Sequence, residues 1–145
     1  MNNTAKIPQL FLRQALGIGF ILPVLDRLGV LGEAGVNGNA WGNWANFVTY
    51  TNTLLPFLDK PAAGIMALLA TIAEALFGVL LIIGYKTKLT ALGSFALTLI
   101  FALCMTFSIG PRIPFNYSVF ADSAAALLLS TIPVYYWSVD RYLKK

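Results

Sequence analysis

Four apolar segments, each long enough to cross a membrane as a helix, account for most of this sequence of 145 residues. They run over residues 7–25, 61–84, 89–109 and 117–137, and each contains at most one charged residue. Roughly 20 apolar residues in helical form span the hydrocarbon core of a bilayer. No alternation of polar and apolar residues suggests strands, so every backbone group must be paired within helices. The sequence therefore predicts an all-α membrane protein, one domain over residues 1–145 that forms a four-transmembrane-helix bundle.

The composition excludes several classes of protein. The chain is 58% hydrophobic and only 11% charged, whereas about 25% of a typical soluble domain is charged. The net charge of +4 comes from scattered basic residues that form no basic face, so no nucleic-acid partner is expected. With no histidine and a single cysteine, Cys104, we expect no metal site, no covalent cofactor and no internal disulfide. Redox chemistry here would need a bound organic cofactor or a partner.

Basic residues predict the orientation. Two breaks, residues 84–88 and 110–114, separate the last three segments. With an even number of spans, both termini and the first of these turns share one side, which holds the larger group of lysines and arginines: Lys6, Lys86, Lys88, Arg141, Lys144 and Lys145. The opposite side holds Arg27, Lys60 and Arg112. By the positive-inside rule, we expect a multi-pass protein of the inner (cytoplasmic) membrane with cytoplasmic N- and C-termini.

The long first loop, residues 26–60, contains a further helical pattern. Apolar residues recur at helical spacing from Trp44 onward, Asn43 suits an N-cap, and Pro56 would interrupt the helix. We expect an interfacial helix in this first extracytoplasmic loop. Trp41, Trp44 and Phe47 are candidates for a lid over a site that opens to the outer leaflet. The simpler interpretation is a helix that only seals the ends of the bundle.

Charged residues inside the apolar segments are the main candidates for function. A charge at mid-membrane costs about 2.5–3.5 kcal/mol on insertion scales, so it usually faces the bundle or water. Glu74 lies ten residues before Gly84, about 15 Å along a helix and near the bilayer midplane. Arg13 enters from the same side, and Thr98 falls at the depth of Glu74. We predict an Arg13–Glu74 ion pair with Thr98 as a further hydrogen-bond partner.

Asp122 is expected nearer the outer surface. It lies with Ser118, Ala126 and Ser130 on one i, i+4 stripe, which indicates a packing face or the wall of a polar cavity. Arg27 and Arg112 are the cations at that level. These charged residues have two interpretations, structural ion pairs or a site for a quinone, a lipid headgroup or a proton. No catalytic residue is predicted.

Small residues predict where the helices pack closely. They occur around Gly17 and Gly19, on the second segment and on the fourth: Ala63, Ala67, Ala70, Ala121 and Ala125.

Several short motifs, in order, give the chain a family resemblance. Leu12-Arg13-Gln14-Ala15-Leu16-Gly17 and Arg27-Leu28-Gly29 are followed by Glu74-Ala75-Leu76-Phe77-Gly78 with Gly84 and a basic turn, and Ser138-Val139-Asp140 comes near the end. This arrangement resembles the DoxX family of small bacterial membrane proteins over nearly the whole chain. Many members carry a histidine before the basic-Leu-Gly element, where this chain has Leu22-Pro23-Val24, so any role of that histidine is absent.

The resemblance implies a four-helix membrane bundle with a link to respiratory or sulfur redox chemistry. It does not imply that the chain is an enzyme on its own. Our leading hypothesis is an accessory subunit that binds a quinone or lipid among its helices and works with a redox partner protein or as a homo-oligomer. Two alternatives stay open, a small proton-coupled transporter with Glu74 as its titrating group, and a purely structural membrane scaffold.

Overall fold

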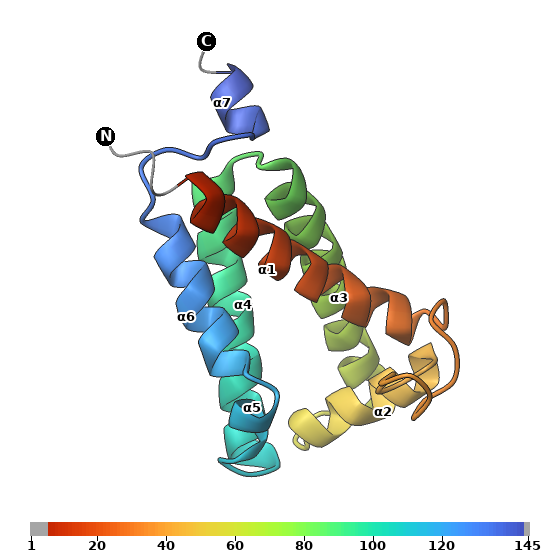
Figure 1. Cartoon of the computed structure of the whole chain (residues 1–145). Coiled ribbons are helices and arrows are strands. Elements are labelled where there is room, and N and C mark those ends of the chain that lie inside the picture. The colour runs from red at the N-terminus through yellow and green to blue at the C-terminus, as the bar shows by residue number, and fades with distance from the viewer. Residues whose placement is uncertain (1–5, 144–145) are drawn as a thin grey trace.

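The computed structural model describes residues 6–143, and all regular structure in this range is helical. The elements are α1 (Lys6–Arg27), α2 (Trp44–Leu54), α3 (Lys60–Ile83), α4 (Thr87–Ser108), α5 (Ile113–Asn116), α6 (Val119–Ser130) and α7 (Val139–Leu143). Figure 1 shows α4 and α6 side by side, while α1 crosses α3 obliquely. The short helices lie at the ends, with α2 and α5 at one end of the bundle and α7 at the other.

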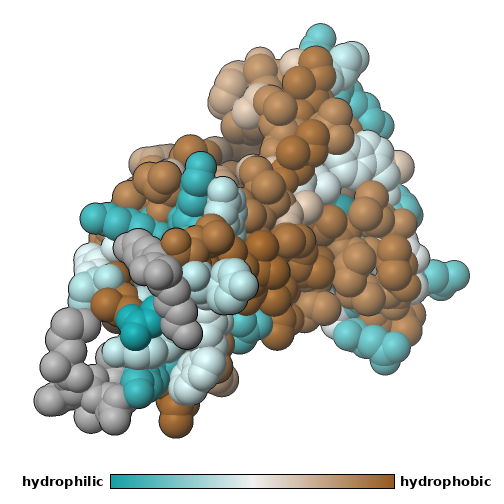
Figure 2. Space-filling model, turned by 90° about the horizontal axis from the view of Figure 1, so that it is seen from above, coloured by the Kyte–Doolittle hydropathy of each residue, from teal (hydrophilic) through white to brown (hydrophobic). Residues whose placement is uncertain are grey.

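Within residues 6–143, three helices have the length and apolar composition needed to cross a membrane. These are α1, α3 and α4, with 22, 24 and 22 residues. Large apolar side chains remain exposed along them, and Figure 2 shows hydrophobic residues over much of the visible surface. A water-soluble monomer rarely exposes such an area. These surfaces therefore match the predicted membrane-facing helices.

The fourth apolar segment is a shorter helix than predicted. Instead of residues 117–137, α6 covers Val119–Ser130 and has 12 residues, which is about 18 Å of helix. Pro133 follows three residues after the end of α6. Proline has no backbone N–H and clashes with the preceding turn, so the helix ends ahead of it. Residues 131–138 then continue without helical structure to α7.

The packing face of α6 matches the predicted stripe only in part. Its buried residues are Ser123, Ala126, Leu129 and Ser130, while Asp122 is exposed. On α4, the buried residues include Ala91, Ser94 and Ala102. Among the alanines expected at close contacts, Ala63 and Ala67 are buried, whereas Ala121 is exposed. Small residues do face one another between α4 and α6: Ala126 and Ser130 of the predicted stripe are buried there, whereas Ser118 and Asp122 are exposed and Ser123 takes part instead.

α1 and α3 approach each other closely at two glycines. A β-carbon at Gly17 would lie 3.0 Å from the carbonyl oxygen of Gly78, and one at Gly78 would lie 3.0 Å from that of Gly17. At Gly19, in contrast, no atom from another part of the described chain lies within 4 Å of such a position. Only Gly17 of the predicted Gly17–Gly19 region therefore serves the helix crossing, which sets the oblique path of α1.

Substituting these glycines is expected to give opposite results. Gly17→Ala should lower the melting temperature, because its methyl group would force the two backbones apart. Gly19→Ala is the matched control and should leave the melting temperature unchanged or raise it slightly, since alanine is favoured over glycine in a helix by about 1 kcal/mol. Thermal unfolding in detergent measures both. Equal melting temperatures for the two variants would contradict the crossing geometry.

α2 lies across the end of α3 (Figure 1). The side chain of Asn43 accepts a hydrogen bond of 2.9 Å from the N–H of Asn46, which confirms the predicted N-cap. The helix ends at Leu54, two residues before Pro56, as the sequence predicted. Ser108 Oγ donates to the carbonyl oxygen of Leu54 at 2.7 Å, which ties the end of α2 to the end of α4.

Candidate functional site

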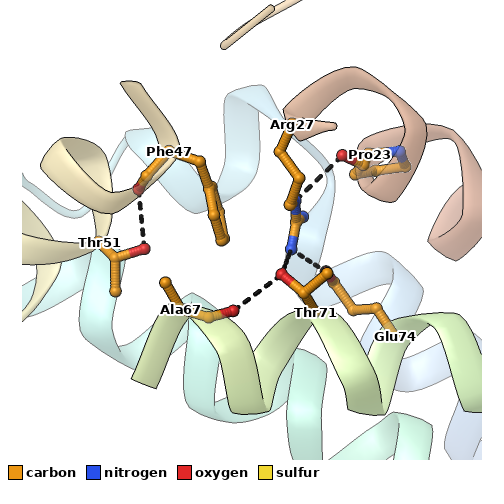
Figure 3. Close-up of polar contacts among 7 residues, drawn as sticks. All are labelled: Pro23, Arg27, Phe47, Thr51, Ala67, Thr71 and Glu74. Carbon is orange, nitrogen blue, oxygen red and sulfur yellow. Dashed lines mark hydrogen bonds and ion pairs between the residues drawn. The ribbon is translucent and has the colours of Figure 1, made fainter. Parts of the chain in front are cut away.

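A buried ion pair joins the end of α1 to the middle of α3. Arg27 Nη1 contacts Glu74 Oε2, and the two side chains are only 2% and 6% exposed. The predicted Arg13–Glu74 pair is therefore wrong. That prediction assumed helices that run parallel through the membrane, whereas α1 crosses α3 obliquely and brings its C-terminal end beside Glu74 (Figures 1 and 3).

Hydrogen bonds fix the Arg27 guanidinium in place. Nε donates to the carbonyl oxygen of Pro23 at 3.0 Å, and Nη1 donates to Thr71 Oγ1 at 3.0 Å. Thr71 in turn donates to the carbonyl oxygen of Ala67 at 2.8 Å (Figure 3). Thr71 lies one helical turn before Glu74, on the same buried face of α3. Thr71 was not among the predicted site residues, because the apolar segments contain several hydroxyl groups and the prediction chose Thr98 by its depth in the membrane.

Aromatic rings of the first loop cover this guanidinium. Its central carbon lies 3.8 Å from the centroid of the Phe47 ring and 5.1 Å from that of Trp41. Trp41 packs edge-on against Phe47 at 5.0 Å, and Trp44 lies 5.8 Å from Phe47. A cation over an aromatic face in a desolvated place gains about 2 kcal/mol. Trp41, Trp44 and Phe47, the candidates for a lid, therefore form one cluster with Arg27.

Asp26 anchors the chain that carries these rings. Its Oδ2 accepts hydrogen bonds from the backbone N–H groups of Ala40 at 2.7 Å and Trp41 at 3.2 Å, and its Oδ1 accepts from Gly42 at 2.8 Å. The residue is buried despite its charge. Sequence reasoning did not identify Asp26. The one available signal was an acidic residue at the end of an apolar helix, directly before a glycine-rich loop.

The remaining predicted site residues lie elsewhere. Thr98 Oγ1 donates to the carbonyl oxygen of Ser94 in its own helix at 2.8 Å rather than to Glu74. Asp122 and Arg112 are exposed, and neither forms an ion pair within residues 6–143. The structure therefore brings together Arg27, Glu74 and the aromatic cluster, and leaves Arg13, Thr98, Asp122 and Arg112 outside it.

Arg13 belongs to a separate contact at the opposite end of the bundle. Its Nη2 donates to the carbonyl oxygen of Trp137 at 2.6 Å, and its Nη1 to that of Tyr136 at 3.4 Å. Gln9 Nε2 donates to the same Tyr136 oxygen at 3.1 Å. These bonds hold the non-helical segment after α6 against α1. Arg13 is buried because it anchors the chain, and its partners are backbone carbonyls rather than a carboxylate.

Asp140 completes this contact by capping α4. Its two carboxylate oxygens accept hydrogen bonds of 2.7 Å from the backbone N–H groups of Lys86 and Thr87. Its own N–H donates to the carbonyl oxygen of Gly84 at 2.9 Å. A carboxylate stabilises the free N–H groups and the positive end of the helix dipole. The Ser138-Val139-Asp140 motif therefore fastens the C-terminal segment to the α3–α4 turn.

Within residues 6–143, no three or more cysteine, aspartate or glutamate side chains gather in a way that could hold a metal ion. The candidate site therefore consists of one ion pair, one threonine hydroxyl and an aromatic cluster, between α1, α3 and the first loop. Such a site offers hydrogen bonds to a polar group and flat apolar surfaces to a ring.

Comparison with known proteins supports the resemblance noted in the sequence. The model of the DoxX family matches residues 9–107, which is more than half of the chain. The match contains Arg27, Glu74 and the whole aromatic cluster. No curated protein and no solved structure matches the chain.

Proposed function

The chain belongs to the DoxX family of integral membrane proteins, and on that premise we propose that it binds a quinone or a lipid at the Arg27–Glu74 pair and assists a redox partner protein. The observation that carries this proposal is a buried guanidinium held between a carboxylate on α3 and the rings of the first loop. Its hydrogen bonds use Nε and Nη1. Nη2 is then the donor that a ligand carbonyl or phosphate oxygen would engage.

The chemistry of the surroundings favours an apolar ligand with a polar head. The guanidinium donates hydrogen bonds, and quinone carbonyls or lipid head oxygens accept them. Trp41, which is only partly buried, provides a ring against which a flat quinone ring would stack, and Phe47 packs against the inner side of that ring. α1 and α3 present apolar side chains beside the site for an isoprenoid or acyl tail. The lid role of Trp41, Trp44 and Phe47 is part of this proposal.

We also propose the membrane arrangement. Lys6, the α3–α4 turn and α7 lie at one end of the bundle (Figure 1), which gathers Lys86, Lys88 and Arg141 there. The positive-inside rule makes this the cytoplasmic end in the inner membrane. α1, α3 and α4 are three spans, and α5, α6 and the chain that follows form the fourth crossing. α2 then lies in the outer interface, with the site beneath it.

An accessory role fits the small number of side chains in this sequence that could take part in redox chemistry. It has no histidine and one cysteine, so electron transfer would rely on the bound quinone and on a partner. Contact with membrane lipid, with a redox protein or with a second copy would cover the exposed apolar faces. The family's link to redox chemistry supports this choice over the transporter and the scaffold.

Quinone binding near Trp41 is testable by fluorescence, because quinones quench tryptophan emission. In the Trp44→Phe/Trp137→Phe variant, Trp41 is the only tryptophan left of three. We expect decylubiquinone to quench its emission along a saturable curve with a dissociation constant in the micromolar range, about −8 kcal/mol. Adding Glu74→Gln should weaken binding about tenfold or more, since it disturbs the donor that the ligand uses.

The control uses the other end of the molecule. With Trp41→Phe and Trp44→Phe, the remaining Trp137 lies beside Arg13, far along α1 from Arg27. Its quenching should rise only linearly, as expected for quinone dissolved in the micelle. Linear quenching at Trp41 as well would reject the quinone site. Proton flux in liposomes, lost in Glu74→Gln, would then favour the transporter, and a change in stability alone would favour the scaffold.

A further inference from the structure

A cleft lined by cations and apolar residues lies at the opposite end of the bundle from the Arg27–Glu74 pair. It is a cleft of about 810 Å³ beside the first turn of α4, within the range of 300–1,000 Å³ typical of small-molecule sites. The early end of α6 creates it. Because α6 stops at Ser130 while α4 begins at Thr87, the chain at residues 131–135 leaves the start of α4 uncovered, and Leu89 is 65% exposed there.

The walls of this cleft combine cations with an apolar floor. Lys86, Lys88 and Arg141 line it together with apolar residues, namely Leu89, Ile132, Pro133 and Val134. None of the three cations forms an ion pair within the described range 6–143. Two of them rest near aromatic rings, with Lys86 Nζ 5.7 Å from the Tyr85 centroid and the Arg141 guanidinium carbon 5.1 Å from that of Tyr136. Their charges therefore remain available to an anion.

One acidic residue, Asp140, also lines the cleft. Both of its carboxylate oxygens accept backbone hydrogen bonds at the start of α4, so its charge is opposed by the positive end of that 22-residue helix. Three cations against one capped carboxylate leave the cleft net positive. A basic pocket between helices on the cytoplasmic side of a membrane is suited to a lipid headgroup.

We propose that this cleft binds a phosphate group of the kind carried by anionic phospholipids, with Lys86, Lys88 and Arg141 around the phosphate and an acyl chain along Leu89 and Ile132. Lysine and arginine are the residues that pair with phosphate oxygens most strongly. The apolar floor favours a phosphate that brings a hydrocarbon chain over a free ion. Binding there would hold the C-terminal segment against the bundle.

Thermal unfolding of delipidated protein in a neutral detergent tests this site. We expect dioleoylphosphatidylglycerol to raise the melting temperature by on the order of 5 °C, because a ligand that binds only the folded state stabilises it. Dioleoylphosphatidylcholine, which has no net charge, should give little change. Inorganic phosphate is the third probe. If it matches phosphatidylglycerol, the site takes free phosphate, and the lipid assignment is wrong.

Two variants make the result specific. Lys88→Glu places an acid in the first turn of α4, where it favours the helix dipole, so the variant should fold well and yet lose the response to phosphatidylglycerol. Lys60→Gln/Arg112→Gln removes two cations near the other end and should keep the response. A full response in Lys88→Glu would overturn the proposal. Quinone quenching at Trp41 is measured separately at the opposite end, so either proposal can fail without the other.

Discussion

Replacing Glu74 with alanine is expected to lower the free energy of unfolding by about 3–5 kcal/mol, because it leaves a buried guanidinium without its counter-charge. Arg27 is 2% exposed, and within residues 6–143 Glu74 is the only carboxylate that forms an ion pair with it. Its remaining partners are the neutral oxygens of Pro23 and Thr71. Equilibrium unfolding in mixed micelles, followed by helical circular dichroism, measures this change.

A double-mutant cycle of Arg27→Met and Glu74→Ala measures the coupling between the two side chains. A further variant replaces both of them with apolar residues. Arg27→Met/Glu74→Leu removes both charges, so we expect it to recover most of the stability that Glu74→Ala loses. Glu33→Gln, which changes an exposed acid in the first loop, is the matched control and should change stability by less than about 0.5 kcal/mol. If Glu74→Ala costs the same with methionine at position 27 as with arginine, the two side chains are not coupled.

The second large effect is expected at Asp26. Asp26→Ala removes the acceptor of three backbone N–H groups, and a hydrogen bond to a charged group contributes about 1.5–3 kcal/mol. The loop that carries Trp41 should open locally. We expect the amides of Ala40, Trp41 and Gly42 to exchange with deuterium at least about tenfold faster, since about 1.4 kcal/mol of lost protection gives that factor.

Asp59→Ala provides the comparison at the same end of the bundle. Asp59 caps α3 by accepting from the N–H of Ala62 at 3.0 Å. Loss of such a cap costs about 1 kcal/mol, and it should speed exchange only in the first turn of α3. Unchanged exchange at residues 40–42 in Asp26→Ala would show that Asp26 does not hold the loop.

The sequence predicted the parts of the fold that depend on local chemistry. The lengths of the apolar segments predicted α1, α3 and α4. Asn43 and Pro56 predicted the two limits of α2. Pro133 lies within the fourth apolar segment, and α6 stops three residues before it. The loss of helix on the N-terminal side of a proline extends over a turn, and only packing decides how far.

The partner of Glu74 could not be predicted in the same way. The prediction of Arg13 compared how far each residue lies along its helix from the cytoplasmic side. That distance equals depth in the membrane only when the helices run parallel. The crossing at Gly17 and Gly78 tilts α1 and exchanges which arginine meets the carboxylate. Both glycines were visible in the sequence, yet the angle of a crossing depends on how the whole contact surface packs.

Contacts from a side chain to a distant backbone leave no pattern in the sequence. Asp26 binds N–H groups 14 to 16 residues away, and Asp140 binds N–H groups 53 and 54 residues away. Every residue type offers the same N–H, so nothing in the sequence marks the partner. The packing face of α6 was predicted only in part, with Ala126 and Ser130 buried but Asp122 exposed, because neighbouring stripes of small residues on one helix look alike.

The most direct test of the account is native mass spectrometry of the protein extracted gently from its own membrane, with extraction of quinones and lipids from the same sample. Besides any anionic phospholipid held in the cleft beside α4, we expect about one quinone or lipid per chain that is depleted in Glu74→Gln and in Phe47→Leu but retained in Glu33→Gln. A ligand-free protein, whose Glu74 and Phe47 variants differ from it only by unfolding at lower temperature, would make the Arg27–Glu74 pair purely structural and contradict the proposed function.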